Sequence, residues 1–216
     1  MQRMESSLRR AQIAEAALAI MAHQGIGAVT VRGVAAAVGI SAAALYRHYL
    51  NKTEILQAIM EEHQENFLAN IRKAKQGAGS PLDALHRLYL LTMALVDRYY
   101  ALPILFSSDV LWFKEPQLRA IKLHNHKVLR LLLVHMIKKA QAHGEMRRDL
   151  RAEEIAVCFI GLFAIPALLK ARTPNALDLT YQITANWELF TRALSATDTS
   201  ASPTCSLTVQ SVSRKA

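Results

Sequence analysis

Residues 30–52, which read TVRGVAAAVGISAAALYRHYLNK, constrain the fold more than any other segment of this 216-residue chain. The first part of the segment has apolar side chains at helical spacing, at Val31, Val34, Ala35 and Val38. The run stops at Gly39, and glycine accepts the positive φ that a tight turn requires. A second helical run opens at Ser41 with Leu45 as its apolar anchor, and the small Ala35 leaves room where the two helices cross. The segment therefore predicts a helix-turn-helix.

A helix-turn-helix places a short helix in the major groove of DNA. The chain carries 26 Lys and Arg against 17 Asp and Glu, a formal net charge of +9, which favours a polyanionic partner. Double-stranded DNA is therefore the expected partner. The basic N-terminus, with Arg3, Arg9 and Arg10, is either a solvated face or an arm that adds contacts to DNA.

Helical periodicity continues along most of the chain and strand-like alternation is absent, so the expected fold class is all-α. The apolar pattern and its breaks predict nine helices, over residues 7–23, 31–38, 42–49, 52–76, 80–100, 104–112, 117–143, 152–170 and 177–194. Pro166 is expected to kink the eighth helix, because proline removes a backbone hydrogen bond. Residues 196–216 are rich in Ser and Thr and are expected to form a disordered tail.

The motif, followed by YRHYLNKTEIL at the start of a long helix, resembles the TetR family of bacterial transcriptional repressors. The matching residues are Thr30, Arg32, Ala35, Val38, Gly39, Ser41, Leu45, Tyr46, His48, Tyr49, Lys52, Glu54, Ile55 and Leu56. The resemblance covers about residues 11–60, with a weaker signature at PILFSSDVLWFKEPQLRA. It implies a nine-helix TetR-like fold, with a three-helix DNA-binding domain over residues 1–51 and a helical ligand-binding and dimerisation domain over residues 52–195.

Nine residues are expected to contact DNA: Thr30, Arg32, Ser41, Ala42, Ala43, Tyr46, Arg47, His48 and Lys52. The resemblance assigns phosphate contacts to the positions of Tyr46, His48 and Lys52, and base reading to the start of the second helix. Short side chains there let that helix sit deep in the groove, with alanine methyls against thymine methyls. Because Arg47 is its only long polar side chain, direct base readout is expected to be thin and shape readout correspondingly important.

Gly33 departs from the family pattern. Many relatives carry an acid at this position, which closes a capping box with the preceding threonine. Glycine cannot do so and costs roughly 1 kcal/mol relative to alanine within a helix. The first helix of the motif is therefore expected to be less stable before it meets DNA.

The resemblance also places an effector cavity among the fourth to eighth helices. The expected ligand-binding residues are Phe67, Met93, Phe106, Trp112, Phe113, Met136, Phe159 and Phe163, with plain core packing as the alternative for each. The last two predicted helices would pair with those of a second copy. The expected interface residues are Ile155, Phe159, Leu162, Leu179, Ile183, Trp187 and Phe190, with burial inside the monomer as the alternative.

Other chemistry is not expected. His124 and His126, two residues apart on a helix, diverge by about 200°, so neither a metal site nor a cofactor is predicted. Cys158 is expected to be a buried small hydrophobe. No nucleophile or paired-carboxylate constellation supports an enzyme. The N-terminus lacks an apolar leader, and no uninterrupted apolar run approaches the roughly 18 to 20 residues of a membrane span, so a cytoplasmic protein without a membrane partner is expected.

The expected function is a homodimeric DNA-binding transcriptional regulator, a repressor that a small apolar or amphipathic effector releases from its operator. The alternative is a TetR-like DNA-binding architectural or adaptor protein that answers to a protein partner. The two differ in whether a closed ligand cavity exists and whether a small molecule releases the DNA.

Overall fold

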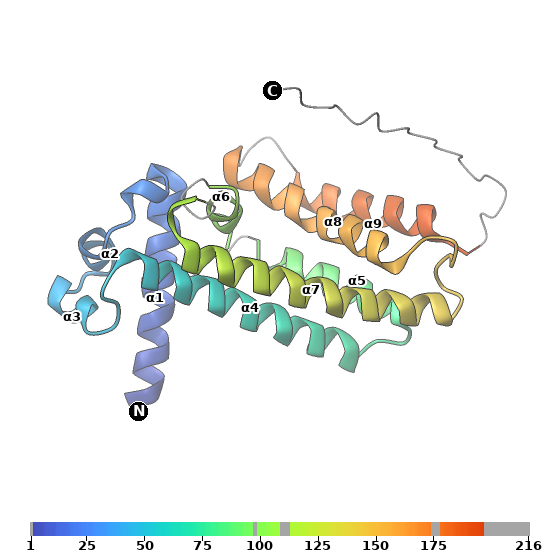
Figure 1. The fold of residues 1–216 in the computed structure, drawn as a ribbon, viewed down its shortest axis with the longest axis horizontal. Coiled ribbons are helices and arrows are strands. Elements are labelled where there is room, and N and C mark those ends of the chain that lie inside the picture. The colour runs from blue at the N-terminus through green and yellow to red at the C-terminus, as the bar shows by residue number, and fades with distance from the viewer. Residues whose placement is uncertain (1, 97–98, 109–112, 174–177, 197–216) are drawn as a thin grey trace, which may run out of the picture.

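The computed structural model describes residues 2–96, 99–108, 113–173 and 178–196, and no strand occurs among them. The helices are α1 (Gln2–Gln24), α2 (Val31–Val38), α3 (Ala42–Tyr46), α4 (Lys52–Gln76), α5 (Pro81–Met93), α6 (Leu102–Phe106), α7 (Pro116–Ala142), α8 (Ala152–Arg172) and α9 (Leu179–Leu194), with a 3-10 turn, η1 (Ile26–Ala28), after α1. The all-α expectation is confirmed (Figure 1). The predicted tail lies outside the described residues from position 197 onward.

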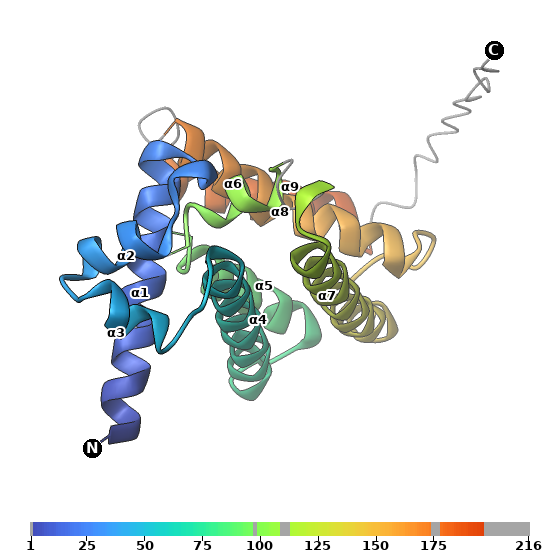
Figure 2. The same ribbon diagram turned by 60° about the vertical axis from the view of Figure 1, so that its left-hand side comes forward.

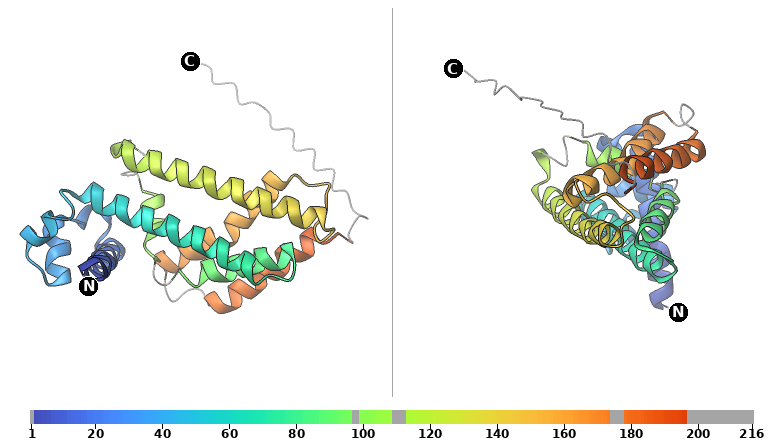
Figure 3. Two further views of the ribbon diagram at one scale, coloured as in Figure 1. Left: turned by 90° about the horizontal axis from the view of Figure 1, so that it is seen from below. Right: turned by 90° about the vertical axis from the view of Figure 1, so that its right-hand side faces the viewer.

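Helices α1–α3 form a head at one end of the molecule, and α4–α9 form an elongated bundle (Figure 1). Helix α4 leaves the head and runs along the bundle beside α7 (Figure 3). Two local hydrogen bonds fix its start. The Asn51 side chain accepts from the Glu54 amide at 2.9 Å, and the Glu54 carboxylate accepts from the Leu50 amide at 2.7 Å.

Two hydrophobic cores hold these parts together. The first joins α1–α3 to the start of α4, and it also takes in Tyr99, Ala101, Leu102, Leu105 and Leu118 from the α6 region and the start of α7. The second fills the bundle between α4, α5, α7, α8 and α9. The first core therefore crosses the domain boundary expected at residue 51.

Helix α6 occupies the junction between the two parts. It packs against α1 of the head on one side and against α8 on the other (Figure 2). Leu105 is fully buried in the first core, whereas Phe106 is only partly buried. A short helix in contact with both parts can transmit a displacement from one to the other.

Three helices end clearly earlier than the sequence pattern predicts. Helix α3 stops at Tyr46 instead of near residue 49. Helix α5 stops at Met93 instead of near residue 100, and i→i+3 bonds at the Leu95 and Val96 amides follow it. Helix α6 stops at Phe106 instead of near residue 112, and the hydroxyls of Ser107 and Ser108 donate to α6 carbonyls there.

Helix α8 is apolar on nearly all sides. It is the one helix in the described ranges that is long and apolar enough to cross a membrane by length and composition, with a mean hydropathy of 2.0 and 28% of its apolar stretch buried. Its surface includes Cys158, which is exposed. The expectation of a buried Cys158 was wrong, because the cysteine lies on the face of α8 that points away from the bundle core.

Candidate nucleic-acid interface and effector cavity

The first helix of the motif, α2, is closed at both ends by local bonds. Thr30 precedes it in extended conformation, and its Oγ1 accepts from the Gly33 amide at 3.0 Å. Gly39 ends it with φ 76° and ψ 32°, a left-handed conformation that suits glycine. The Ile40 amide then donates to the Ala35 carbonyl at 3.0 Å, which completes the turn.

The second helix, α3, is short and firmly anchored. Ser41 caps it by accepting from the Ala44 amide at 3.1 Å, and Leu45 is fully buried beneath it. Its amides continue the helical turn as far as Tyr49, which donates to the Leu45 carbonyl at 3.0 Å. The caps use the Thr30 and Ser41 oxygens as acceptors, so each hydroxyl proton is left for another acceptor such as a phosphate.

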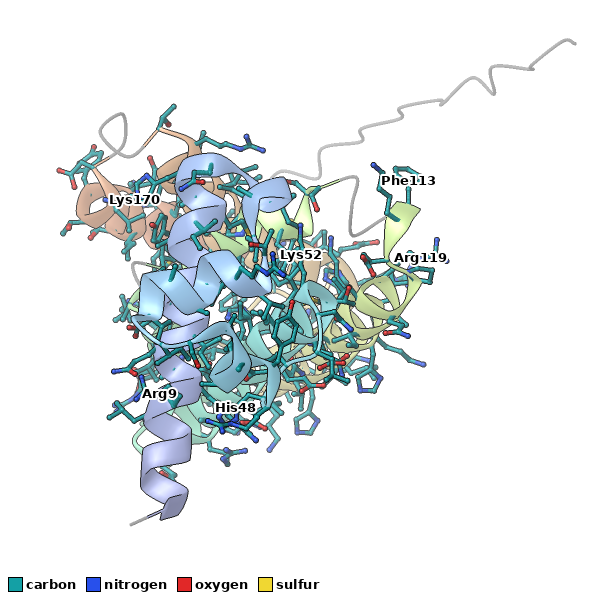
Figure 4. The ribbon with its side chains drawn as sticks, turned by 90° about the vertical axis from the view of Figure 1, so that its left-hand side faces the viewer. Arg9, His48, Lys52, Phe113, Arg119 and Lys170 are labelled. Carbon is teal, nitrogen blue, oxygen red and sulfur yellow. The ribbon has the colours of Figure 1, made fainter. Side chains whose placement is uncertain are left out.

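A set of polar side chains covers the exposed side of this motif. Arg32, Tyr46, Arg47 and His48 are all exposed, together with the small Ala43. The side chains of Arg32, Arg47 and His48 make no hydrogen bond or ion pair with the described part of the chain. Polar side chains without internal partners are free to meet phosphates. Figure 4 shows this end of the molecule, with Arg9 and His48 labelled on it.

Lys52 is partly exposed, and its ammonium donates to the Ile26 carbonyl in η1. Burial lowers the pKa of Lys52, while the nearby Glu115 carboxylate acts in the opposite direction. Lys52 therefore links η1 to the start of α4, and Figure 4 labels it together with His48.

Gly33 lies where the cap of α2 is formed. A Cβ at this position would lie 3.0 Å from the Thr30 Oγ1 that caps α2, a tight contact. The same cap is made to the amides of Ala44, Glu54 and Asp83, which carry a Cβ, so glycine is not required for the bond. Helix α2 is capped by Thr30 alone, without the reciprocal acid of a capping box.

A cavity of about 340 Å³ lies inside the bundle, walled by α4, α6, α7, α8 and the segment that follows α5. Its wall is mostly apolar, with Leu95, Val96, Leu129 and Leu168 among its residues. This size lies near the lower end of the range for small-molecule sites, about 300–1,000 Å³. The bundle can therefore hold a compact apolar ligand.

Three of the eight expected ligand residues line this cavity: Phe67, Phe106 and Phe163. Met93, Met136 and Phe159 are instead buried in the second core, because they point between helices. Phe113 is 80% exposed at the start of the α7 region and projects away from the bundle (Figure 4). Trp112 lies outside the described residues.

The cavity wall also holds His63, which was not among the expected ligand-binding residues. The His63 ring stands edge-on to Tyr99 at 5.4 Å and lies 6.2 Å from Phe106. Its Nδ1 atom is shielded from solvent and has no hydrogen-bond partner within the described chain. Burial lowers the pKa of His63 to about 4. The only sequence signal was a histidine at a core-facing position of a helix.

The expected interface residues on α8 and α9 pack against the second core of the monomer to different extents. Ile155, Phe159 and Phe190 are buried, and Leu162, Leu179, Ile183 and Trp187 are partly buried against the second core. The exposed apolar residues of the two helices are Val157, Ile165, Leu169, Tyr181 and Leu189. Because α8 is apolar all round, the sequence could not indicate which side faces inward.

The other histidines form no evident metal site. Within the ranges that the structure describes, no group of three or more His, Cys, Asp or Glu side chains is placed to hold a metal ion. His124 and His126 are both exposed on α7, and His126 also lines the cavity.

Comparison with known proteins gives a family and several relatives. Residues 13–59 match the family model described as bacterial regulatory proteins, tetR family. The transcriptional repressor KstR2 of Mycobacterium tuberculosis is 25% identical over 143 residues, 66% of this chain and 71% of that protein. The nucleoid occlusion factor SlmA of Pasteurella multocida is 24% identical over 159 residues, 71% of this chain and 78% of that protein.

Solved structures share the fold. The ketosteroid transcriptional regulator KstR2 of Mycobacterium tuberculosis aligns with a TM-score of 0.71 at 20% identity, over 87% of this chain and 95% of that one. The fatty acid degradation regulator FadR from Bacillus halodurans aligns with a TM-score of 0.70 at 19% identity, over 84% of this chain and 94% of that one.

Proposed function

We propose, for a chain that belongs to the TetR family of bacterial regulatory proteins, that it is a homodimeric repressor released from its operator by a small apolar or amphipathic ligand. The general class, a DNA-binding transcriptional regulator, follows from the family match and the relatives. The single observation that supports the DNA-binding site is the exposed, internally unpaired set of Arg32, Arg47 and His48 on a capped helix-turn-helix. A cytoplasmic location in contact with the chromosome belongs to the same proposal.

In this proposal each subunit places α3 in a major groove. The hydroxyls of Thr30 and Ser41 and the cations of Arg32 and Arg47 hold the phosphates on either side. Two subunits then read half-sites about one helical turn, roughly 34–36 Å, apart. Because the recognition helix presents mostly alanines, sequence preference arises from DNA shape and from apolar contacts with thymine methyls.

The exposed apolar sides of α8 and α9 support the dimer. Val157 is 59% exposed and Leu189 is 67% exposed, on two helices that pack against each other. Burial of such side chains against a second copy removes apolar surface from water at about 25 cal/mol per Å². The seven residues first expected at the interface belong to the second core or pack against it, and so they hold α8 and α9 in position for the proposed dimer.

Helix α6 supplies a route from ligand to DNA. Leu102 lies in the cavity wall and also in the core of the head, and Phe106 lines the cavity at the end of the same helix. A ligand that spreads the cavity displaces α6 and, through its contact with α1, reorients the head. The ligand needs only to prefer the state in which the two recognition helices no longer fit successive grooves.

The experiment compares DNA from the region upstream of the gene with random DNA of equal length, over a range of salt concentrations. Arg47→Ala is expected to weaken binding to both and to lower the slope of log K against log salt by about one unit per subunit, because one phosphate contact is lost. Fluorescence anisotropy measures both quantities.

Arg72→Ala is the matched control, since Arg72 is exposed and lies twenty residues along α4 from Lys52, about 30 Å away. It should leave affinity and slope near the wild-type values. A wild-type protein that binds both DNAs equally would contradict the proposal of an operator, and an unchanged slope in Arg47→Ala would contradict the phosphate role.

The second candidate is a DNA-binding architectural or adaptor protein that answers to a protein partner, and the similarity to the nucleoid occlusion factor SlmA favours the architectural role. The mostly apolar cavity in the bundle favours the ligand instead. A screen of small molecules by thermal shift, followed by measurement of DNA release, separates the two. Ligands that stabilise the protein and release the DNA support the first candidate, and stabilisation without release supports the second.

A further inference from the structure

We propose that the cavity selects a neutral ligand, an apolar skeleton that carries one hydroxyl group, and that this hydroxyl makes its hydrogen bond with Nδ1 of His63. The inference rests on the proposed function only in taking the bundle cavity as the effector site. It adds the chemical class of the effector and the residue that recognises it.

One nitrogen in the cavity wall, Nδ1 of His63, lacks a hydrogen-bond partner among the described residues. Nδ1 of His63 is shielded from solvent and has no partner in the described chain, although buried polar atoms are almost always hydrogen-bonded. The imidazole belongs to the cavity wall, and so do both aromatic rings beside it, Tyr99 and Phe106. A ligand in the cavity is therefore the natural source of the missing partner.

The imidazole of His63 carries no charge at neutral pH. Burial lowers the pKa of His63 to about 4, so the ring is neutral near pH 7. A neutral imidazole has one nitrogen that donates and one that accepts. A hydroxyl both donates and accepts, so it satisfies Nδ1 in either tautomer.

The cavity wall is mostly apolar. It includes Phe67, Leu95, Val96 and Phe163, which cannot solvate an ion, and fewer polar side chains, among them Gln64 and Asn125, which are uncharged. A carboxylate moved there from water would lose its hydration without full compensation, whereas a single hydroxyl would lose little once it is bonded. The wall therefore favours a neutral ligand.

Lys122 is the one ammonium in the wall, and it is the group that a carboxylate ligand would seek. It already donates to the Phe106 carbonyl at 2.6 Å, and its ammonium lies 5.6 Å from the centre of the Phe106 ring. Burial lowers the pKa of Lys122, which weakens its preference for the charged form. An acidic ligand bound through Lys122 is the alternative that the experiment must separate.

The position of His63 also connects recognition to the head. Its neighbour Tyr99 donates to the Glu62 carboxylate at 2.9 Å and accepts from the Asn66 amide at 2.7 Å. Tyr99 is itself buried in the core shared with α1–α3. A hydroxyl bound at His63 therefore lies beside a residue that belongs to the core of the head.

The experiment uses the full chain and three probes with the same ten-carbon chain: 1-decanol, 1-fluorodecane and decanoate. Isothermal titration calorimetry measures each affinity in the wild type, in His63→Phe and in His63→Asn. We expect decanol to bind the wild type about tenfold more tightly than fluorodecane, the size of one hydrogen bond to a buried group. His63→Phe should abolish this difference while leaving fluorodecane binding unchanged, because the ring is retained.

His63→Asn is the rescue variant, since its amide can reach the place of Nδ1, and it should restore several-fold of the preference for decanol. In the wild type, ¹⁵N NMR of the histidine rings should show decanol shifting the His63 Nδ1 resonance and fluorodecane leaving it in place. This spectrum keeps the test decisive even if a variant fails to fold.

Several results would overturn the assignment. These are an unmoved Nδ1 resonance with decanol bound, failure of all three probes to bind, or decanoate binding most tightly with its affinity lost in Lys122→Gln. Operator release is scored separately in each case. Release by decanoate through Lys122 would leave the proposed function standing and reject only the hydroxyl, whereas tight decanol binding at His63 without release would uphold the ligand class and reject ligand control.

Discussion

Single residues in this protein divide into those whose role is local and those whose role depends on distant neighbours. Thr30 and Ser41 act as helix caps, as their residue types and positions indicate, because a cap bonds an amide three residues away. The internal hydrogen bond of Lys52 was not predicted, and the exposure of Cys158 contradicts the expectation of burial. The partner of Lys52 is the Ile26 carbonyl, 26 residues earlier, and the exposure of Cys158 depends on how α8 is rotated. Neither this hydrogen bond nor this exposure can be inferred from the residues that neighbour Lys52 and Cys158 in the sequence.

His63 gives a prediction about pH at this scale. Its pKa falls from 6.5 to about 4 on burial, so the unfolded chain binds a proton between these values that the folded chain does not. The free energy of unfolding should be unaffected by this group above about pH 6.5. It should fall progressively as the pH drops from 6.5 to 4, by up to about 3 kcal/mol in total.

Urea denaturation at pH 7 and at pH 4.5 measures this loss. His63→Phe removes the titrating group and should reduce the difference between the two pH values by about 2–3 kcal/mol, since most of the window from 6.5 to 4 lies between them. An equal pH dependence in the wild type and the variant would show that other groups account for the loss.

At the scale of elements, ends were predictable where residues adjacent in sequence set them. Helix α2 ends at the predicted Gly39, and α4 spans the predicted residues 52–76. The ends of α5 and α6 were not predictable, because the apolar pattern continues beyond Met93 and Phe106 after the helical bonds have stopped. The cavity was expected among these helices, but its lining depends on how all of them pack.

The Asn51 cap of α4 makes a contribution to the free energy of unfolding that can be measured directly. Asn51→Ala removes the acceptor for the Glu54 amide and should lower the free energy of unfolding by about 1 kcal/mol, as for other lost N-caps. Asn51→Asp keeps an acceptor and adds a negative charge at the helix N-terminus, so it should remain close to the wild type. Chemical denaturation of the three proteins measures both values, and equal stability of Asn51→Ala and the wild type would contradict the capping role.

At the scale of the whole molecule, the sequence led to a proposal of which helices pair between subunits but gave no sign of which of their faces would do so. An all-round apolar helix has two faces of similar hydrophobicity, and only packing against α5, α7 and α9 shows that Ile155 and Phe159 point inward. Val157 and Leu189 are left outside. The interface proposal therefore keeps its helices and changes its residues.

The dimer prediction uses these exposed positions. Val157→Asp combined with Leu189→Asp should shift the protein from dimer to monomer and weaken operator binding, because two buried carboxylates would oppose association and a monomer binds one half-site. Leu131→Asp on α7, a residue that is 54% exposed, is the control and should leave both properties unchanged. Analytical ultracentrifugation measures the state of each, and a dimeric double variant would contradict the α8–α9 interface.

The core that joins the head to α6 has a consequence for protein engineering. One could design a chimera in which the DNA-binding head of one such regulator is fused to the ligand-binding bundle of another. A junction at residue 51 would remove Tyr99, Ala101, Leu105 and Leu118 from the core beneath the helix-turn-helix. Side chains of the other protein would then have to fill their places. A working graft must carry the whole of α6 and the first turn of α7 with the head, so the transferable module is discontinuous in the chain.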